Sequence, residues 1–165
     1  MPMSTDFSNR LSPALRKITD HFGTPFHIYD EKGIGAMMVQ ELYSGEDGAS
    51  HLRDVNIDLN AVEFVAGTAK MGISDPLPIE EFALSTMPAD WVGDWHPAPR
   101  RVLWLILEGE MEIEIGGGLT RRFGPGDILL AGDTSGQGHR TRTLTPVRLA
   151  LARLPEQSQL PAGRA

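Results

Sequence analysis

Short apolar stretches recur along most of the chain, each separated from the next by glycine, proline, aspartate or serine. They cover residues 38–42, 55–59, 62–65, 82–84, 102–107, 111–115, 128–130 and 147–151. Many short strands at such close spacing are typical of an all-β sandwich or barrel. The pattern predicts a barrel over residues 38–154, followed by a flexible tail at 155–165 that has no periodicity.

The clearest predicted element is a hairpin. Residues 111–115 read Met-Glu-Ile-Glu-Ile, so strict alternation places the apolar side chains on one face and the glutamates on the other. Three glycines at 116–118 supply the turn, and Arg121 and Arg122 return on the second strand, where one can oppose a glutamate. We expect this ion pair to contribute to the register more than to stability, and the glutamates to form a solvated strand face.

Residues 1–37 have a different pattern and form a predicted N-terminal extension with one helix. Ser12 and Pro13 are typical of a helix start, and Gly23 is typical of its end. Between them, apolar side chains recur at positions 15, 18 and 22 and form one stripe. A short strand is predicted next, over residues 26–29. A helix of about 12 residues is marginal alone, so we expect the stripe to dock on another part of the protein.

The composition excludes several classes of function. The 165 residues suit a single domain. A net charge of −7 works against binding a phosphate backbone, so nucleic acid is not an expected partner. The absence of cysteine excludes disulfides, thiolate nucleophiles and zinc–thiolate sites. With no signal-peptide pattern and no apolar run near the roughly 20 residues that span a bilayer, we expect a cytoplasmic protein that does not enter a membrane.

Three segments carry the candidate chemistry. They are Gly93-Asp94-Trp95-His96-Pro97-Ala98-Pro99-Arg100-Arg101-Val102, Phe123-Gly124-Pro125-Gly126-Asp127-Ile128-Leu129-Leu130, and Asp133-Thr134-Ser135-Gly136-Gln137-Gly138-His139-Arg140-Thr141. Together they resemble the cupin superfamily, and more narrowly a group of small bacterial-type cupins that share these runs. The resemblance covers residues 38–154 and implies that the predicted barrel is a cupin jelly roll, also called a double-stranded β-helix.

The resemblance also implies a metal site, of which only part is kept. The first cupin motif ends in a glycine, here Gly109, and counting back from it places Val102 at the glutamate ligand and Ala98 at the second histidine. His96 stands at the first histidine position, and His139 follows the second motif. Two of the four ligand positions are therefore kept. We expect a degenerate site, with Fe, Mn, Ni or Zn as the divalent metals to test.

Residues 22–30 carry a second resemblance. Their sequence, Phe-Gly-Thr-Pro-Phe-His-Ile-Tyr-Asp, is similar to the start of pyridoxal-phosphate decarboxylases of the ornithine/diaminopimelate type. The chain has no matching barrel or Schiff-base lysine motif, so we do not expect that activity.

Two enzymatic hypotheses remain open. In the first, His96 and His139 join Asp94 in a two-histidine, one-carboxylate metal centre, the pattern of non-haem iron oxygenases. In the second, His96 acts as a general base held by Asp94 without a metal, as in sugar-nucleotide epimerases of the cupin superfamily. The substrate of either enzyme is expected to be a small organic acid or a sugar derivative.

The third hypothesis is a small-molecule-binding module without catalysis. Trp95, Trp104 and His139 would line the mouth of the barrel, and Arg100 would clamp an anionic or aromatic ligand. Simpler structural roles compete with these assignments, because His96 can be satisfied by backbone groups and Trp104 can belong to the core. Open jelly rolls leave sheet edges, so a homodimer is expected in every case.

Overall fold

The computed structural model describes residues 27–29 and 35–161, and this part of the chain is built almost entirely from β-strands. The strands are β1 (His27–Tyr29), β2 (Gly35–Ser44), β3 (Ser50–Ile57), β4 (Asn60–Val62), β5 (Met71–Ile73), β6 (Glu81–Met87), β7 (Val102–Glu108), β8 (Met111–Ile115), β9 (Leu119–Phe123), β10 (Ile128–Gly132), β11 (Arg140–Thr143) and β12 (Val147–Arg153). The helix expected at 12–22 lies outside the described residues. Within them, no helix has the length and apolar character needed to cross a membrane.

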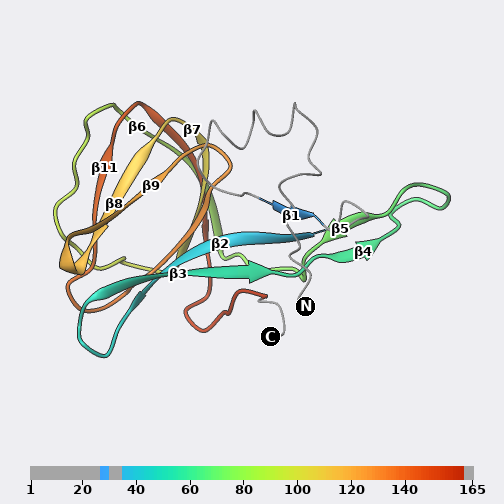
Figure 1. Cartoon of the computed structure of the whole chain (residues 1–165), viewed down its shortest axis with the longest axis horizontal. Coiled ribbons are helices and arrows are strands. Elements are labelled where there is room, and N and C mark those ends of the chain that lie inside the picture. The colour runs from blue at the N-terminus through green and yellow to red at the C-terminus, as the bar shows by residue number, and fades with distance from the viewer. Residues whose placement is uncertain (1–26, 30–34, 162–165) are drawn as a thin grey trace, which may run out of the picture.

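Two sheets face each other and form a barrel (Figure 1). The large sheet has the order β1-β2-β10-β7-β12-β6, with β3 also paired to β2, and the small sheet has the order β11-β8-β9. Bridges from Val92 to Arg142 and from His96 to His139 add the segment before β7 to the edge of the small sheet. The chain thus passes back and forth between the sheets. The order β6-β12-β7-β10 in the large sheet faces the order segment-β11-β8-β9 in the small sheet, where the segment is the one before β7. That order is a jelly roll with cupin topology, which confirms the predicted fold class.

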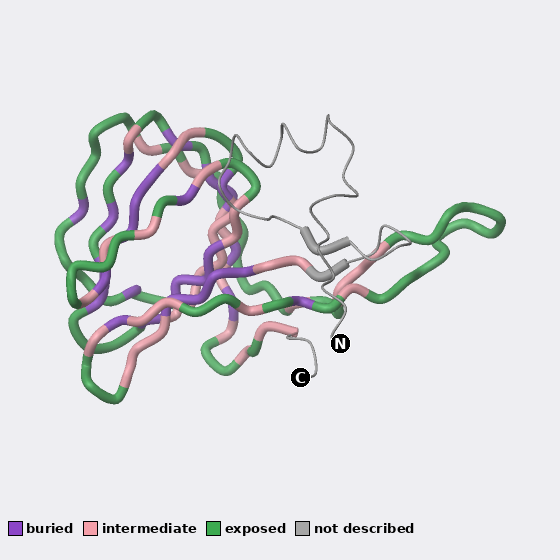
Figure 2. Tube along the Cα trace, viewed as in Figure 1, coloured by how far each residue is buried: buried purple, intermediate pink, exposed green. Residues whose placement is uncertain are grey.

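Apolar side chains from both sheets fill the interior of the barrel, and Figure 2 shows buried residues along the strands of both sheets. The large sheet contributes Leu42, Ile106, Leu129 and Leu149, and the small sheet contributes Met111, Ile113, Ile115 and Phe123. All are at most 5% exposed, and burying such a side chain is worth roughly 1.5–3 kcal/mol. This closely packed interior holds the two sheets, and the loops between them, in fixed positions.

A second cluster covers part of the outer face of the large sheet. Val39, Ile57 and Leu130 are buried there under Leu154, which directly follows β12. Leu160 packs against the same cluster, so residues 155–161 run back over the sheet. The last four residues of the expected tail, 162–165, lie outside the described part of the chain.

The predicted hairpin at 111–123 is confirmed. β8 and β9 pair in the register that sets Glu112 opposite Arg122, and the apolar residues of β8 point into the core. The turn takes a positive φ at Gly117 and Gly118, 77° and 78°, which is why glycines occupy it.

A separate two-stranded arm, β4 and β5, projects from the barrel (Figures 1 and 2). Every residue from 60 to 71 is exposed. The apolar stretch at 62–65, which the sequence pattern places in the barrel, lies instead on this arm.

Candidate histidine site

His96 and His139 form a reciprocal pair where the segment before β7 meets the start of β11. The His96 N–H donates to the His139 carbonyl at 3.1 Å, and the His139 N–H donates to the His96 carbonyl at 3.0 Å. Their ring centroids lie 4.9 Å apart, with the planes inclined by 49°. Gly138 permits this approach, because a Cβ there would overlap the His96 carbonyl and its φ of 76° suits glycine. The two imidazoles that the sequence singles out are therefore neighbours.

A buried carboxylate orients His139. Its Nδ1 lies 2.8 Å from Oδ2 of Asp133, which follows β10, and the same oxygen accepts a 2.7 Å hydrogen bond from Oγ of Ser50 at the start of β3. All three residues are at most 2% exposed. An ionised carboxylate only accepts, so Nδ1 of His139 is the donor, and in a neutral imidazole this tautomer leaves the lone pair at Nε2.

A main-chain carbonyl orients His96, and it also does so through Nδ1 of the ring. Its Nδ1 lies 2.8 Å from the carbonyl oxygen of Asp94, which can only accept, so Nδ1 is the donor, and in a neutral imidazole Nε2 again has the lone pair. The sequence predicts that the carboxylate of Asp94 orients this ring, whereas the bond comes from its backbone. The carboxylate that does orient an imidazole belongs to Asp133, which opens the third candidate segment but to which the sequence analysis assigns no role. Asp133 is 83 positions from Ser50 in the sequence, so no local pattern predicts the hydrogen bond between them.

His139 is buried and His96 is exposed, and further buried polar atoms accompany His139. Within the described chain, Oδ1 of Asp133, Oγ1 of Thr141 and Oε1 of Gln40 are buried without a hydrogen-bond partner. Thr141 lies two residues after His139 and shares its face of the strand. Gln40 stands on the same face of β2 as the core residue Leu42. Buried polar atoms normally have partners, so these three oxygens are hydrogen-bonding groups that the described chain leaves unpaired.

The residues present do not fit a resident metal ion. No cluster of three or more potential ligands is found among the residues that the structure describes. Ala98, at the second histidine position of the family, is 3% exposed, and its N–H donates to the carbonyl of Asp133 at 3.0 Å. Val102 brings only an alkyl group to the glutamate position. Two imidazole nitrogens are fewer than the three or four protein ligands usual for a tightly held ion.

The contacts of Trp95, Trp104 and Arg101 are with residues other than the two histidines. Trp95 is 37% exposed, and the guanidinium of Arg140 lies 5.8 Å from its ring centroid on the outer side of the small sheet. Trp104 packs against the barrel core from β7. Arg100 is exposed, whereas its neighbour Arg101 lies 3.4 Å from Glu41. The structure thus brings His96 and His139 together and gives Trp104 a packing role.

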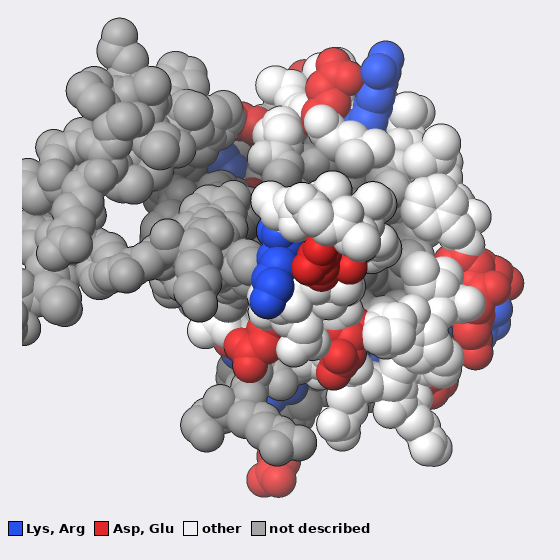
Figure 3. All heavy atoms as spheres, turned by 90° about the vertical axis from the view of Figure 1, so that its right-hand side faces the viewer, with Lys and Arg blue, Asp and Glu red and all other residues white. Residues whose placement is uncertain are grey.

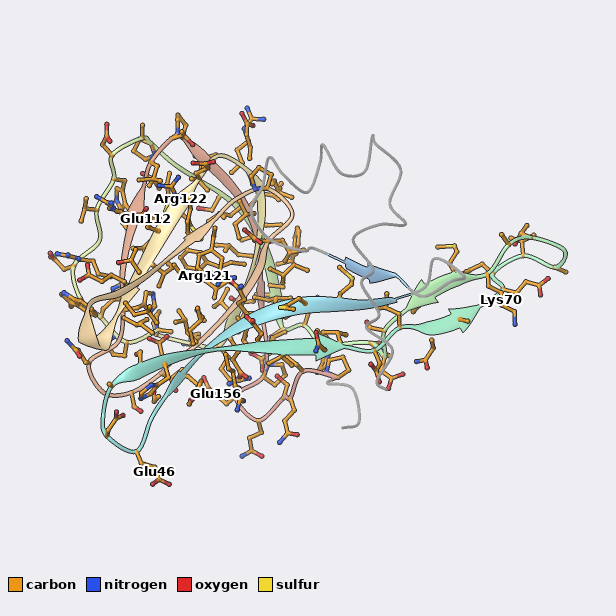
Figure 4. The ribbon with its side chains drawn as sticks, viewed as in Figure 1. Glu46, Lys70, Glu112, Arg121, Arg122 and Glu156 are labelled. Carbon is orange, nitrogen blue, oxygen red and sulfur yellow. The ribbon has the colours of Figure 1, made fainter. Side chains whose placement is uncertain are left out.

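A charged groove of about 420 Å³ lies on the outer face of the small sheet. Glu112, its most buried acid, is held between Arg142 at 2.5 Å and Arg122 at 3.2 Å, and Figure 4 shows Glu112 and Arg122 side by side. Hydrogen bonding from Arg142 lowers the pKa of Glu112, against the opposing effect of burial. This glutamate is not part of a solvated strand face. The groove is lined by Val92, Glu112, Glu114, Thr120, Arg140 and Arg142.

The strand order defines a jelly-roll barrel of the cupin type. The histidine pair adds two neighbouring imidazoles to this barrel. No family model matches the chain. "Protein TabA" of Pseudomonas amygdali pv. tabaci is 53% identical over 34 residues, which are 21% of this chain and 8% of that protein. The chain therefore spans less than a tenth of this relative's length. The similarity of residues 22–30 to decarboxylases stays a prediction.

Solved structures with partial likeness include the Cnp3 cupin domain of Schizosaccharomyces pombe, with 14% identity and a TM-score of 0.37 over 71% of this chain and 86% of that one. The DMSP lyase DddQ of Ruegeria pomeroyi DSS-3 has 30% identity and a TM-score of 0.38 over 47% and 39%. A putative ethanolamine utilization protein of Salmonella typhimurium has 19% identity and a TM-score of 0.32 over 74% and 98%.

Proposed function

We propose that the chain is a small-molecule-binding cupin whose metal site is degenerate, and that His96 and His139 present their Nε2 atoms to an organic ligand. One observation carries this proposal: both Nδ1 atoms are occupied by fixed acceptors while the rings lie 4.9 Å apart. In their neutral form both rings therefore offer a hydrogen-bond acceptor at Nε2 without rearrangement.

The chemistry of the surrounding atoms supports a hydroxylated ligand. Two imidazole lone pairs accept hydrogen bonds, and so do the buried oxygens of Asp133 and Thr141 that have no partner in the described chain. A sugar derivative or a hydroxy acid supplies several O–H donors close together. Such a ligand satisfies groups whose burial is otherwise costly, by about 1–3 kcal/mol each.

A metal-free isomerase is the second candidate, and the carboxylate beside His139 favours it. A carboxylate that fixes the tautomer of an imidazole and stabilises its protonated form is the arrangement of a general base. In this hypothesis His139, rather than His96, takes the proton from a carbon or hydroxyl of the substrate, and Asp133 stabilises the resulting imidazolium.

Thermal-shift screening of sugars, sugar nucleotides and hydroxy acids, followed by calorimetry, tests the binding proposal. For a ligand that binds, we expect His96→Ala to weaken affinity about tenfold, the loss of one good hydrogen bond. His51→Ala is the matched control, because this ring contacts Asp47 and Tyr43 instead, and we expect its affinity to be unchanged. Equal affinity in all three proteins contradicts the proposal.

Elemental analysis of protein purified without a chelating column separates the proposal from a metal centre. We expect substoichiometric Fe, Mn, Ni and Zn. One equivalent of a single metal, lost in His96→Ala, would replace the organic-ligand proposal with a metal centre completed by groups other than these two rings.

A further inference from the structure

The arm formed by β4 and β5 exposes apolar side chains that no other described part of the chain covers. Phe64 and Val65, next to its tip, are 61% and 63% exposed, and Met71 is 53% exposed. Among residues 27–29 and 35–161, these two strands pair only with each other, from Asn60–Ile73 to Val62–Met71. An isolated two-stranded hairpin is marginally stable in water, so an arm of this kind requires a surface to pack on.

The large sheet exposes an apolar face beyond the part that Leu154 and Leu160 cover. On β6, Phe82 is 64% exposed and Leu84 is 74% exposed, and Leu107 on β7 is 55% exposed. The ladder places Leu84 beside Ala150, and Ala150 beside Leu105, so these side chains share the outer face of the sheet. We call Phe82, Leu84 and Leu107 the outer apolar face.

β6 also lies at one end of the strand order in its sheet, and its sequence, Glu-Phe-Ala-Leu-Ser-Thr-Met, contains no proline or lysine. Natural proteins commonly protect a sheet edge with such residues. The edge strand β6 and the outer apolar face together resemble one half of a protein–protein interface.

Arm and outer apolar face lie on the same side of the molecule. In Figure 1 the small sheet lies to the left of the large sheet and the arm extends to the right, so the outer face of the large sheet turns toward the arm. Figure 3 views the molecule from that side, and uncharged residues predominate to the right of its centre. Two copies placed face to face would therefore bring both features into contact together.

We propose that the partner is a second copy of this chain, and that the arm of each copy lies on the outer apolar face of the other around a twofold axis. Around a twofold axis, the arm of each copy covers the outer apolar face of the other. Both surfaces are then buried in both copies. The area is sufficient: at roughly 100 Å² for a half-exposed large side chain, the apolar residues involved give on the order of 800 Å² per copy, as in a standard interface. The residues are Val62, Phe64, Val65, Met71, Ile79, Phe82, Leu84 and Leu107.

Size-exclusion chromatography with light scattering on the full chain tests this dimer. At micromolar concentration we expect wild type at twice the chain mass of 18.0 kDa, and both Phe64→Glu and Leu84→Glu at the single mass. Leu119→Glu is the matched control, because Leu119 is 57% exposed on β9 of the small sheet; it should remain dimeric. Circular dichroism confirms folding, and Phe64→Ser and Leu84→Ser replace any glutamate variant that fails to fold.

A mixing experiment distinguishes arm-to-face contact from other dimers. When Phe64→Glu and Leu84→Glu are mixed, both defects fall into one of the two contacts and the other contact is wild type. Dimers should reappear in the mixture and in neither variant alone.

Three results overturn the proposal. They are a monomeric wild type at all concentrations, dimers that persist in both glutamate variants, and a mixture that stays monomeric. Co-sedimentation of a monomeric wild type with phosphatidylcholine–phosphatidylglycerol vesicles, lost in Phe64→Glu, would assign the arm to a membrane surface instead.

Discussion

Glu112 shows how tightly one charged residue is held on the outer face of the small sheet. Its side chain is 11% exposed, and guanidinium groups approach it from both neighbouring strands, Arg142 on β11 and Arg122 on β9. An exposed ion pair contributes little to stability because water screens it. Here the carboxylate is largely removed from water, so these hydrogen bonds help to join the three strands of the sheet.

The lowered pKa of Glu112 makes a prediction for acid stability. Its folded-state pKa lies below the ordinary value of 4.5, so its contribution is complete above about pH 4.5 and is lost as the pH falls through the folded-state pKa. We expect Glu112→Gln to cost about 1–2 kcal/mol of unfolding free energy at pH 7 and progressively less in acid. Urea unfolding between pH 7 and pH 3 measures both curves.

Glu108→Gln serves as the control for this pH series. Glu108 also pairs with an arginine, Arg148 at 3.2 Å, but its side chain is 63% exposed. We expect a loss below about 1 kcal/mol at pH 7. An equal loss in both variants would show that burial of Glu112 adds nothing.

The residues of the candidate site differ in how far the sequence could predict them. His96 and His139 stand in recognisable motifs, so their pairing could be expected from the resemblance alone. Asp133 and Ser50 could not, because a carboxylate after one strand and a hydroxyl at the start of another give no signal until the barrel closes. Trp104 has a residue type that suits both ligand binding and packing, and it packs against the core.

At the scale of elements, local pattern predicts strands better than it predicts their neighbours. β8 and β9 could be predicted because alternation, turn and opposing charges all act within 13 residues. β11 has the sequence Arg-Thr-Arg-Thr and no apolar run, so it was missed. Its alternation is real, since both threonines are buried and both arginines are exposed. The apolar run at 62–65 predicts a barrel strand but lies on the exposed arm. The residue types of this arm are the same as those of core strands, so the pattern does not distinguish the two.

The backbone pairing of His96 with His139 joins the segment before β7 to β11. This pairing depends on Gly138. A side chain there would overlap the His96 carbonyl, and its φ of 76° strains any other residue. We expect Gly138→Ala to lower the unfolding free energy by about 3 kcal/mol or more, because it adds steric overlap to backbone strain. Denaturant unfolding measures the loss, and hydrogen exchange should show faster exchange at the amides of His96 and His139.

Gly126→Ala separates the two causes. Gly126 also has a positive φ, 93°, but a Cβ there meets no atom within 4 Å. We expect it to cost about 1–2 kcal/mol from backbone strain alone and to leave the His96 and His139 amides protected. Equal effects of the two substitutions would mean that the histidine pair does not depend on close approach at Gly138.

At the scale of the whole molecule, the barrel and the arm follow different physical rules. The barrel is closed by apolar side chains from both sheets, so its existence follows from the number and spacing of short apolar strands. The parallel pairing of β10 with β2 joins residues about 90 positions apart, and no pattern within either strand specifies it. Among the described residues the arm adds no residue to either buried cluster, so packing in these clusters does not account for its apolar side chains.

Deleting the arm tests this division of roles. Replacing residues 60–73 with a short Gly-Ser linker removes no residue of either buried cluster, so the barrel should unfold within about 2 °C of the Phe64→Glu monomer. That monomer is the proper reference, because dimerisation itself raises the melting temperature of wild type by mass action. Scanning calorimetry at matched concentration measures the difference. A deletion variant that melts far below the Phe64→Glu monomer would show that the arm supports its own barrel, whereas equal melting leaves a contact beyond its own chain as the arm's role.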